Sequence, residues 1–116
     1  MNNSISLKTV LAASGETPAQ QGVLFALLNL GMIESLANGL LSATDAVQAF
    51  FHTENCLFVR KRLRDKTADA IMSHGVQLPD VFDVLPREEA HREFHRELAI
   101  MRALCLKLLA EKQLVA

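Results

Sequence analysis

Apolar residues recur at intervals of three and four along most of the chain, and short polar stretches with glycine or proline separate the runs. This spacing is typical of helices, and no alternation with a period of two lasts more than a few residues. The first run begins at Thr17 and Pro18, which suit a helix cap and a first helical position, and Gly39 follows its end. It is apolar on nearly every side, which predicts a helix over 18–38 that is buried against several neighbours. Gly31 in its middle could allow another backbone to approach closely.

Three further polar caps predict three further helices. Ser42 begins a capping box for a helix over about 43–52. Thr53 would cap a third helix, and Asp65 would cap a fourth that Gly75 closes.

The segment between Pro79 and Pro86 is apolar, but the two prolines make a full helix there unfavourable. We expect one short helical turn, held on the core by Phe82. The last helix begins at Pro86 or Arg87 and runs to about Gln113, which gives it a length of about 40 Å.

Together these elements predict an all-α fold, a single-domain helical bundle of about five helices with a long C-terminal helix. A length of 116 residues suits one domain. Residues 1–16 are polar and lack a steady period, so we expect a flexible N-terminal arm with at most one helical turn around 6–13. Residues 17–116 form the predicted helical domain.

Charge adds little to this picture. The formal net charge is −1, so no global attraction to nucleic acid or anionic lipid is expected. One basic run, "RKRLRDK" at 60–66, stands out, but its cations spread around a helix and no aromatic residue is interleaved for base stacking. We interpret it as a solvated surface; the alternative is a patch over Arg60–Lys66 for an acidic partner or for the phosphates of nucleic acid, and the latter is the less favoured function.

Two features concern the compartment. Cys56 and Cys105 lie far apart among apolar neighbours, which predicts reduced core cysteines and a cytoplasmic protein. The N-terminus does not resemble a signal peptide. The longest apolar stretch, "GVLFALLNLGMI", is about a dozen residues, whereas a membrane span needs about 20. We therefore expect a soluble protein without a membrane partner.

The start of the last helix places Glu88, His91 and His95 on one face. Two imidazoles one turn apart can bind one metal ion, and Glu-x-x-His occurs in di-iron bundles. No second Glu-x-x-His is present to complete such a site. The same stretch carries oppositely charged pairs at helical spacing, so the alternative is an amphipathic, solvent-exposed rim.

No enzymatic motif is present. Phosphate-binding glycine loops, dinucleotide patterns and nucleophile elbows are absent, and neither cysteine has an adjacent base. We therefore expect no catalytic residue, no cofactor and no enzymatic activity.

The apolar surface exceeds what short helices can cover. The first helix is apolar all round, and the last carries a stripe at heptad spacing. An isologous homodimer through both helices would cover this surplus, with the interface residues Leu24, Leu28, Met101, Leu104 and Leu108. The sequence thus favours a non-enzymatic interaction or oligomerisation module; the alternative is a metal-binding helical protein that uses Glu88, His91 and His95.

Two stretches, "LNLGMIESLANGLLSATDAVQAFF" and "SHGVQLPDVFDVLP", resemble an uncharacterised family of short all-helical bacterial proteins. The resemblance spans about residues 23–88. It implies the helical fold and a bacterial origin, but no activity, and it includes neither the basic run nor the histidine pair.

Overall fold

The computed structural model describes residues 4–14 and 17–112 of the chain. These residues form seven α-helices and one π-helical segment, with no strand among them. In chain order the elements are α1 (Leu7–Ser14), α2 (Pro18–Ala37), α3 (Ala43–Ala49), α4 (Thr53–Phe58), η1 (Val59–Leu63), α5 (Lys66–Gln77), α6 (Asp80–Val84) and α7 (Arg87–Lys112). The predicted all-α class with a long C-terminal helix is confirmed.

Local caps begin three of these helices as predicted. The Thr17 and Ser42 side chains each accept from the backbone N–H three residues later, and the residue at that position completes a capping box. The Asp65 carboxylate accepts from the first-turn amides of α5.

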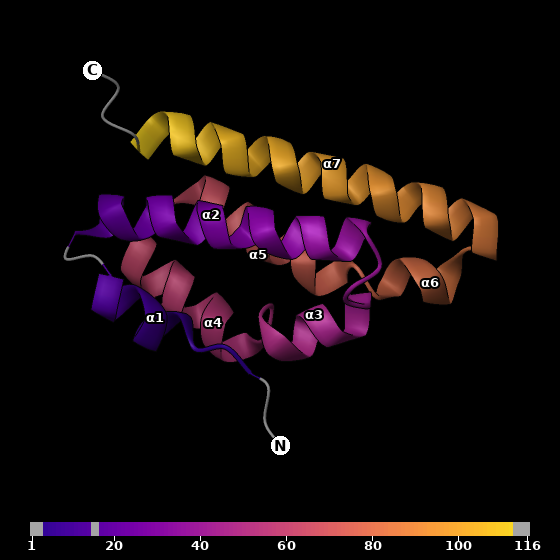
Figure 1. Cartoon of the computed structure of the whole chain (residues 1–116), viewed down its shortest axis with the longest axis horizontal. Coiled ribbons are helices and arrows are strands. Elements are labelled where there is room, and N and C mark those ends of the chain that lie inside the picture. The colour runs from indigo at the N-terminus through magenta and orange to yellow at the C-terminus, as the bar shows by residue number, and fades with distance from the viewer. Residues whose placement is uncertain (1–3, 15–16, 113–116) are drawn as a thin grey trace.

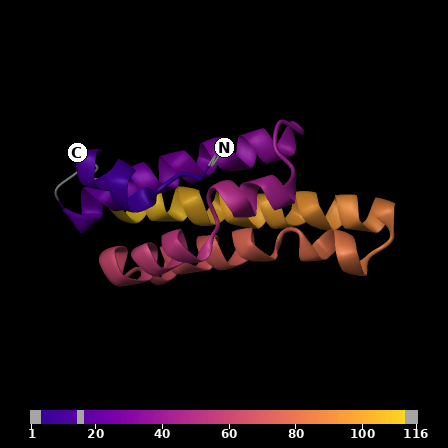
Figure 2. The ribbon, with the colours of Figure 1, turned by 90° about the horizontal axis from the view of Figure 1, so that it is seen from below.

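Helix α7 organises the bundle. It packs against both α2 and α5, and α6 packs against its first half. Helices α2 and α7 lie side by side and run in opposite directions along the long axis of the molecule (Figure 1). Seen from below, α7 lies behind a layer that contains α3, α4 and α1 (Figure 2). The molecule measures 44 × 36 × 22 Å, so α7, at about 39 Å, spans almost its full length.

The core is a single apolar cluster to which α1, α2, α3, α5 and α7 all contribute. Its fully buried large side chains include Phe25, Phe50, Phe51, Ile71 and Met101. The two adjacent phenylalanines, Phe50 and Phe51, meet edge to face with ring centroids 5.0 Å apart.

The N-terminal residues differ from the expected flexible arm. Residues 7–14 form a regular helix, and Leu7 and Leu11 are both 0% exposed. Buried Asn55 binds this segment, because its Oδ1 accepts from the Leu7 amide at 3.0 Å and its Nδ2 donates to the Ile5 carbonyl at 2.9 Å. Spacing alone could not reveal this packing, since the partner residue is 48 positions away.

The middle of the chain departs from prediction in three places. The cap of α4 is His52, one residue before the expected Thr53, and its side chain accepts from the Asn55 amide. Helix α4 continues directly into the π-helical segment η1, which ends where Arg64 adopts φ 49°. Gly75 does not close α5; it lies inside the helix, buried beneath the Phe51 ring.

Gly31 also differs from expectation. It is exposed, and a Cβ built there would meet nothing within 4 Å. Elsewhere in α2, Gly22 is in ordinary van der Waals contact with the aliphatic stem of Lys112, which passes 3.5 Å from the position of a Cβ. Within the described helices, no segment is both long and apolar enough to cross a membrane.

Candidate functional site

The predicted histidine face lies on the exposed side of α7. Glu88, His91 and His95 are all exposed, and the two histidine rings lie edge to face with centroids 5.5 Å apart. The neighbouring Phe94 ring is buried and contacts His95. The expected border between polar rim and apolar core is therefore present.

A metal centre does not follow from this arrangement. Within residues 4–14 and 17–112, no three histidine, cysteine or acidic side chains are grouped so that they could hold an ion. Among these described residues, no facing helix brings a carboxylate to His91 and His95. The sequence likewise contains no second Glu-x-x-His that could complete a di-metal site. His74, which lies on α5, is 2.7 Å from Glu97 and links α5 to α7.

The five predicted interface residues do not form one surface. Met101 and Leu108 are 0% exposed inside a single chain, because α7 turns this stripe towards the core. Leu24, Leu28 and Leu104 are only half-buried. The prediction was wrong about Met101 and Leu108: the heptad stripe of the last helix is used within the chain.

An exposed apolar surface nevertheless exists on the same two helices. The Arg102 guanidinium of α7 lies 3.4 Å from the Glu34 carboxylate of α2, which fixes the register of the antiparallel pair. Counting along the antiparallel helices from this pair places Leu30 level with Leu106 and Leu27 level with Leu109. The side chains of Leu27 and Leu106 are 51% and 54% exposed.

We call this surface the α2–α7 face. It comprises residues at helical spacing on each helix, and all of them are exposed or half-buried. They are Val23, Leu27, Leu30 and Glu34 on α2, and Ala99, Arg102, Leu106 and Leu109 on α7.

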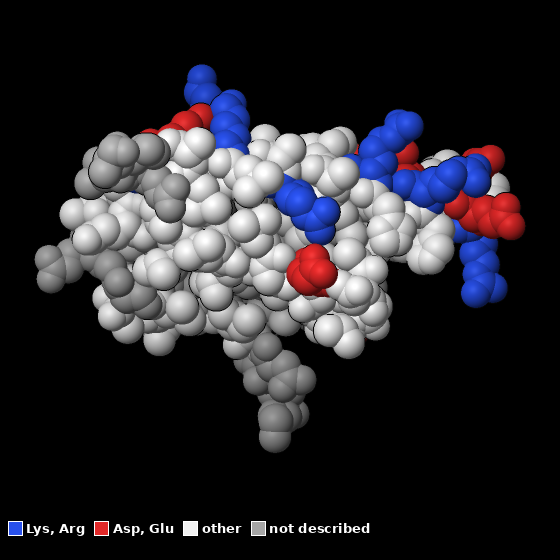
Figure 3. All heavy atoms as spheres, turned by 45° about the horizontal axis from the view of Figure 1, so that its top comes forward, with Lys and Arg blue, Asp and Glu red and all other residues white. Residues whose placement is uncertain are grey.

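Charged side chains are sparse on this side of the molecule. In Figure 3 they gather towards the two ends of α7, and the surface between them is uncharged apart from one adjacent basic and acidic group. The Glu34–Arg102 pair is such a group, and it is exposed, so its net contribution to stability is small. The face is therefore apolar, with one charge of each sign.

The exposed apolar residues of α7 are not the ones that the sequence analysis singled out on that helix. The signal was present, because Ala99, Leu106 and Ala110 form a second apolar line on the opposite side from the heptad stripe. Deciding which of two apolar lines faces the core requires the position of α5 and α2, which the sequence does not provide.

The basic run takes part in internal contacts. Arg62 Nε donates to Gln21 Oε1 of α2 at 2.7 Å, and Arg64 Nε donates to the Lys61 carbonyl at 3.3 Å. Asp65 at the end of the run pairs with Lys112 of α7 at 3.1 Å. Part of this charge therefore tethers η1 and α5 to the two long helices.

The sequence also matches a protein family. A family model described as "Protein of unknown function (DUF3969)" matches residues 17–115. The chain belongs to the DUF3969 family. This confirms the resemblance to an uncharacterised family without an assigned activity. No curated protein and no solved structure matches the DUF3969 chain.

The DUF3969 match begins at Thr17, the cap of α2, so α1 lies outside it. Helices α2 and α7 both lie within the matched residues. The α2–α7 face therefore belongs to the part of the chain that defines its membership in DUF3969.

Proposed function

We propose that this protein is a non-enzymatic interaction module that forms an isologous homodimer through the α2–α7 face. The observation that carries the proposal is the exposure of Leu27 and Leu106, at 51% and 54%, on the two longest helices. Leucine side chains left in water on a face with only one charge of each sign favour burial against a partner, because removing apolar area from water is favourable.

The charges on the face favour a second copy over an unrelated protein. A two-fold axis through the face brings the Glu34 carboxylate of one copy towards the Arg102 guanidinium of the other, and the reverse pair forms at the same time. The Glu34–Arg102 ion pair of each chain then joins that of the other copy in a network of four charges across the interface. A surface with one charge of each sign is thus complementary to itself.

The size of the face is that of the central part of an interface. Each helix is about 10 Å wide and packed helices lie about 9 Å apart, so the pair is roughly 20 Å wide. The residues of the face span about 18 Å along α2, which gives an area on the order of 350 Å². A standard interface buries about 800 Å² per partner, so these residues would form its centre.

The cysteines support the non-enzymatic part of the proposal. Burial raises the pKa of the Cys105 thiol to about 12, so the nucleophilic thiolate is disfavoured. Burial also raises the pKa of Cys56, an effect that outweighs the opposing charge of Arg60. Two unpaired, unreactive thiols suit a reducing compartment, which supports the cytoplasm.

The test is the molar mass in solution, measured by size-exclusion chromatography with light scattering at tens of micromolar protein. The expected mass is twice the chain's 12.8 kDa. Leu106→Asp should give the monomer mass, because it would bury an unpaired carboxylate in the interface. Leu57→Asp is the matched control: Leu57 is 43% exposed on α4, away from the face, and the dimer should persist.

Two results would contradict the proposal. One is a wild-type protein that remains a monomer at this concentration. The other is a dimer that survives Leu106→Asp but dissociates with Leu57→Asp, which would place the interface on α4.

A further inference from the structure

A second feature lies outside the α2–α7 face and does not depend on dimer formation. A hollow of about 490 Å³ opens between the end of α2, the start of α3, α6 and the first half of α7. Pockets that bind small molecules have volumes of about 300–1,000 Å³ and are mostly apolar. This hollow is within that range, and the side chains that line it determine which ligands it can bind.

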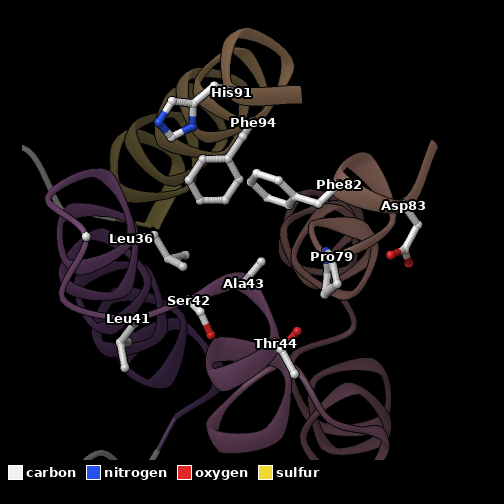
Figure 4. Close-up of a pocket in the computed structure, with 11 residues that line it drawn as sticks. Leu36, Leu41, Ser42, Ala43, Thr44, Pro79, Phe82, Asp83, His91 and Phe94 are labelled. Atoms are coloured by element: carbon white, nitrogen blue, oxygen red, sulfur yellow. The ribbon is translucent and has the colours of Figure 1, made fainter. Parts of the chain in front are cut away.

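The walls are aromatic and aliphatic. In Figure 4 the rings of Phe82 and Phe94 lie close together at the centre, and the side chains of Leu36 and Ala43 point towards them. The two ring centroids are 5.2 Å apart, and the rings are tilted by 55°. Leu36, Ala43 and Phe94 are buried, at 2%, 7% and 6% exposed. The base of the hollow is therefore apolar and formed by buried side chains.

Helix α6 forms the wall that is least covered. It has no buried residue, and Phe82 is 45% exposed although its ring contacts Phe94. Phe82 therefore contacts the core through Phe94, as expected, but nearly half of its side chain remains exposed. An aromatic ring that is held by one neighbour and open on its other side offers a surface for a further ring.

The polar groups are few and lie at the edge. Among the lining residues there is no lysine or arginine. The carboxylate of Asp83 points away from the rings, whereas the His91 ring lies at the rim above Phe94 (Figure 4). Ser42 lies on the opposite side of the hollow from His91, and its hydroxyl accepts from the Asp45 amide and points away from the two rings (Figure 4).

This chemistry discriminates between ligands. An anionic ligand would be desolvated without a cation to pair with, which is costly. A ring without charge would stack on Phe82 and contact Leu36 and Ala43. One hydroxyl or N–H group on that ring would face the imidazole of His91 at the rim. We propose that the hollow is a binding site for an uncharged aromatic small molecule of about two fused rings that carries one polar group.

The absence of tryptophan and tyrosine makes a direct test possible. The chain contains neither residue, so its own fluorescence does not mask that of a naphthalene ring. The probe is 2-naphthol, which is uncharged at neutral pH, titrated with the full-length protein and followed by fluorescence anisotropy. The expected result is saturable binding with one site per chain.

Two variants locate the probe. Ala43→Phe places a ring in the hollow and should weaken binding at least tenfold. Phe82→Ala removes the open aromatic wall and should also weaken binding at least tenfold, and because Phe82 is 45% exposed the fold should be retained. Ala12→Phe, at an exposed position of α1, is the matched control and should bind as the wild type does. Far-UV circular dichroism checks the fold of each variant.

Several outcomes would overturn the assignment. Binding that does not saturate would do so, as would wild-type affinity in a folded Phe82→Ala or Ala43→Phe variant. If these variants changed the molar mass but not the probe affinity, the hollow would be a protein contact. Leu106→Asp should bind 2-naphthol normally, so failure of the dimer proposal and failure of this one are distinguishable.

Discussion

At the scale of single residues, two helical glycines have opposite surroundings. Gly31 is exposed in α2, and a Cβ there would meet open space. Gly75 is buried in α5, and a Cβ there would collide with the ring of Phe51. The same substitution should therefore have opposite effects at the two sites.

Gly31→Ala should raise the free energy of unfolding by about 0.5–1 kcal/mol, because glycine is a poor helix former and nothing opposes the methyl group. Gly75→Ala should lower it by about 1–3 kcal/mol, because the Phe51 ring must move within a packed core. Urea denaturation in the Leu106→Asp background measures both without a contribution from dimer formation. A Gly75→Ala variant more stable than the wild type would contradict this prediction, because it would mean that the Phe51 ring can move aside without cost.

The sequence predicted residue roles only where the partner is close along the chain. Thr17, Ser42 and Asp65 were identified as caps because each binds amides two or three residues away. Asn55 was not singled out, because its partners Ile5 and Leu7 lie about fifty residues earlier. The presence of a polar residue in a short helix does not indicate that its side chain will bind backbone atoms far away in the sequence.

At the scale of elements, the start of α5 is tied to the end of α7. The Lys112 ammonium lies 3.1 Å from the Asp65 carboxylate, and it reaches there because its stem crosses α2 at Gly22. Burial by itself would raise the pKa of Asp65. The amides of Ala68 and Thr67 and the Lys112 ammonium stabilise the carboxylate more strongly, so the net effect lowers its pKa.

This lowered pKa predicts a pH-dependent stability. Asp65 contributes fully above about pH 4, the pKa of aspartate in an unfolded chain, and its contribution is lost as the pH falls through the lower pKa of the folded state. Asp65→Asn should therefore be less stable than the wild type at pH 7, and the difference should shrink as the pH falls from 5 to 3. Thermal melts across this range measure it.

Asp83→Asn is the control for this experiment, since Asp83 is exposed on α6. Its stability relative to the wild type should stay nearly constant with pH. A difference for Asp65→Asn that remained unchanged down to pH 3 would contradict the proposed role of the carboxylate charge.

Among elements, long helices were predicted better than short ones. The bounds of α2 and α7 agree with the apolar runs, because many residues contribute to each period. The π-helical segment η1 was missed, since its residues Val59 and Leu63 also fit an α-helix. Helix α6 was placed correctly between two prolines, but its exposure was not foreseen, because Phe82 finds only Phe94 as an aromatic partner.

At the scale of the whole molecule, the sequence indicated a surplus of apolar surface without showing where it would lie. The structure buries Met101 and Leu108 and leaves Leu27 and Leu106 exposed. The α2–α7 face thus lies on the two helices that were predicted to form the interface, but it consists of other residues of those helices. The hollow beside α6 could not be predicted either, since four separate segments of the chain form it.

A mixing experiment tests the two-fold arrangement of the whole assembly. Glu34→Arg gives a face with two positive charges, and Arg102→Glu gives one with two negative charges, so each variant alone should dissociate more readily than the wild type. A mixture of the two should form dimers of opposite subunits, because every cross pair then joins unlike charges. Native mass spectrometry distinguishes these species if one variant is labelled with ¹⁵N.

A statistical distribution of dimer species in the mixture, with the heterodimer only twice as abundant as each homodimer, would contradict a crosswise Glu34–Arg102 contact. Mixing Leu57→Asp protein with wild-type protein is the control, and it should give a statistical distribution.

The pairing of α2 with α7 has a consequence for synthesis of the chain. About fifty residues separate the two helices, so a ribosome adding 5–20 residues per second exposes α2 for several seconds before α7 is complete. During that interval one of the most apolar segments of the nascent polypeptide has no lasting cover. Expression yield should therefore depend on trigger-factor-like chaperones that shield emerging hydrophobic segments, even though the finished fold has no need of them.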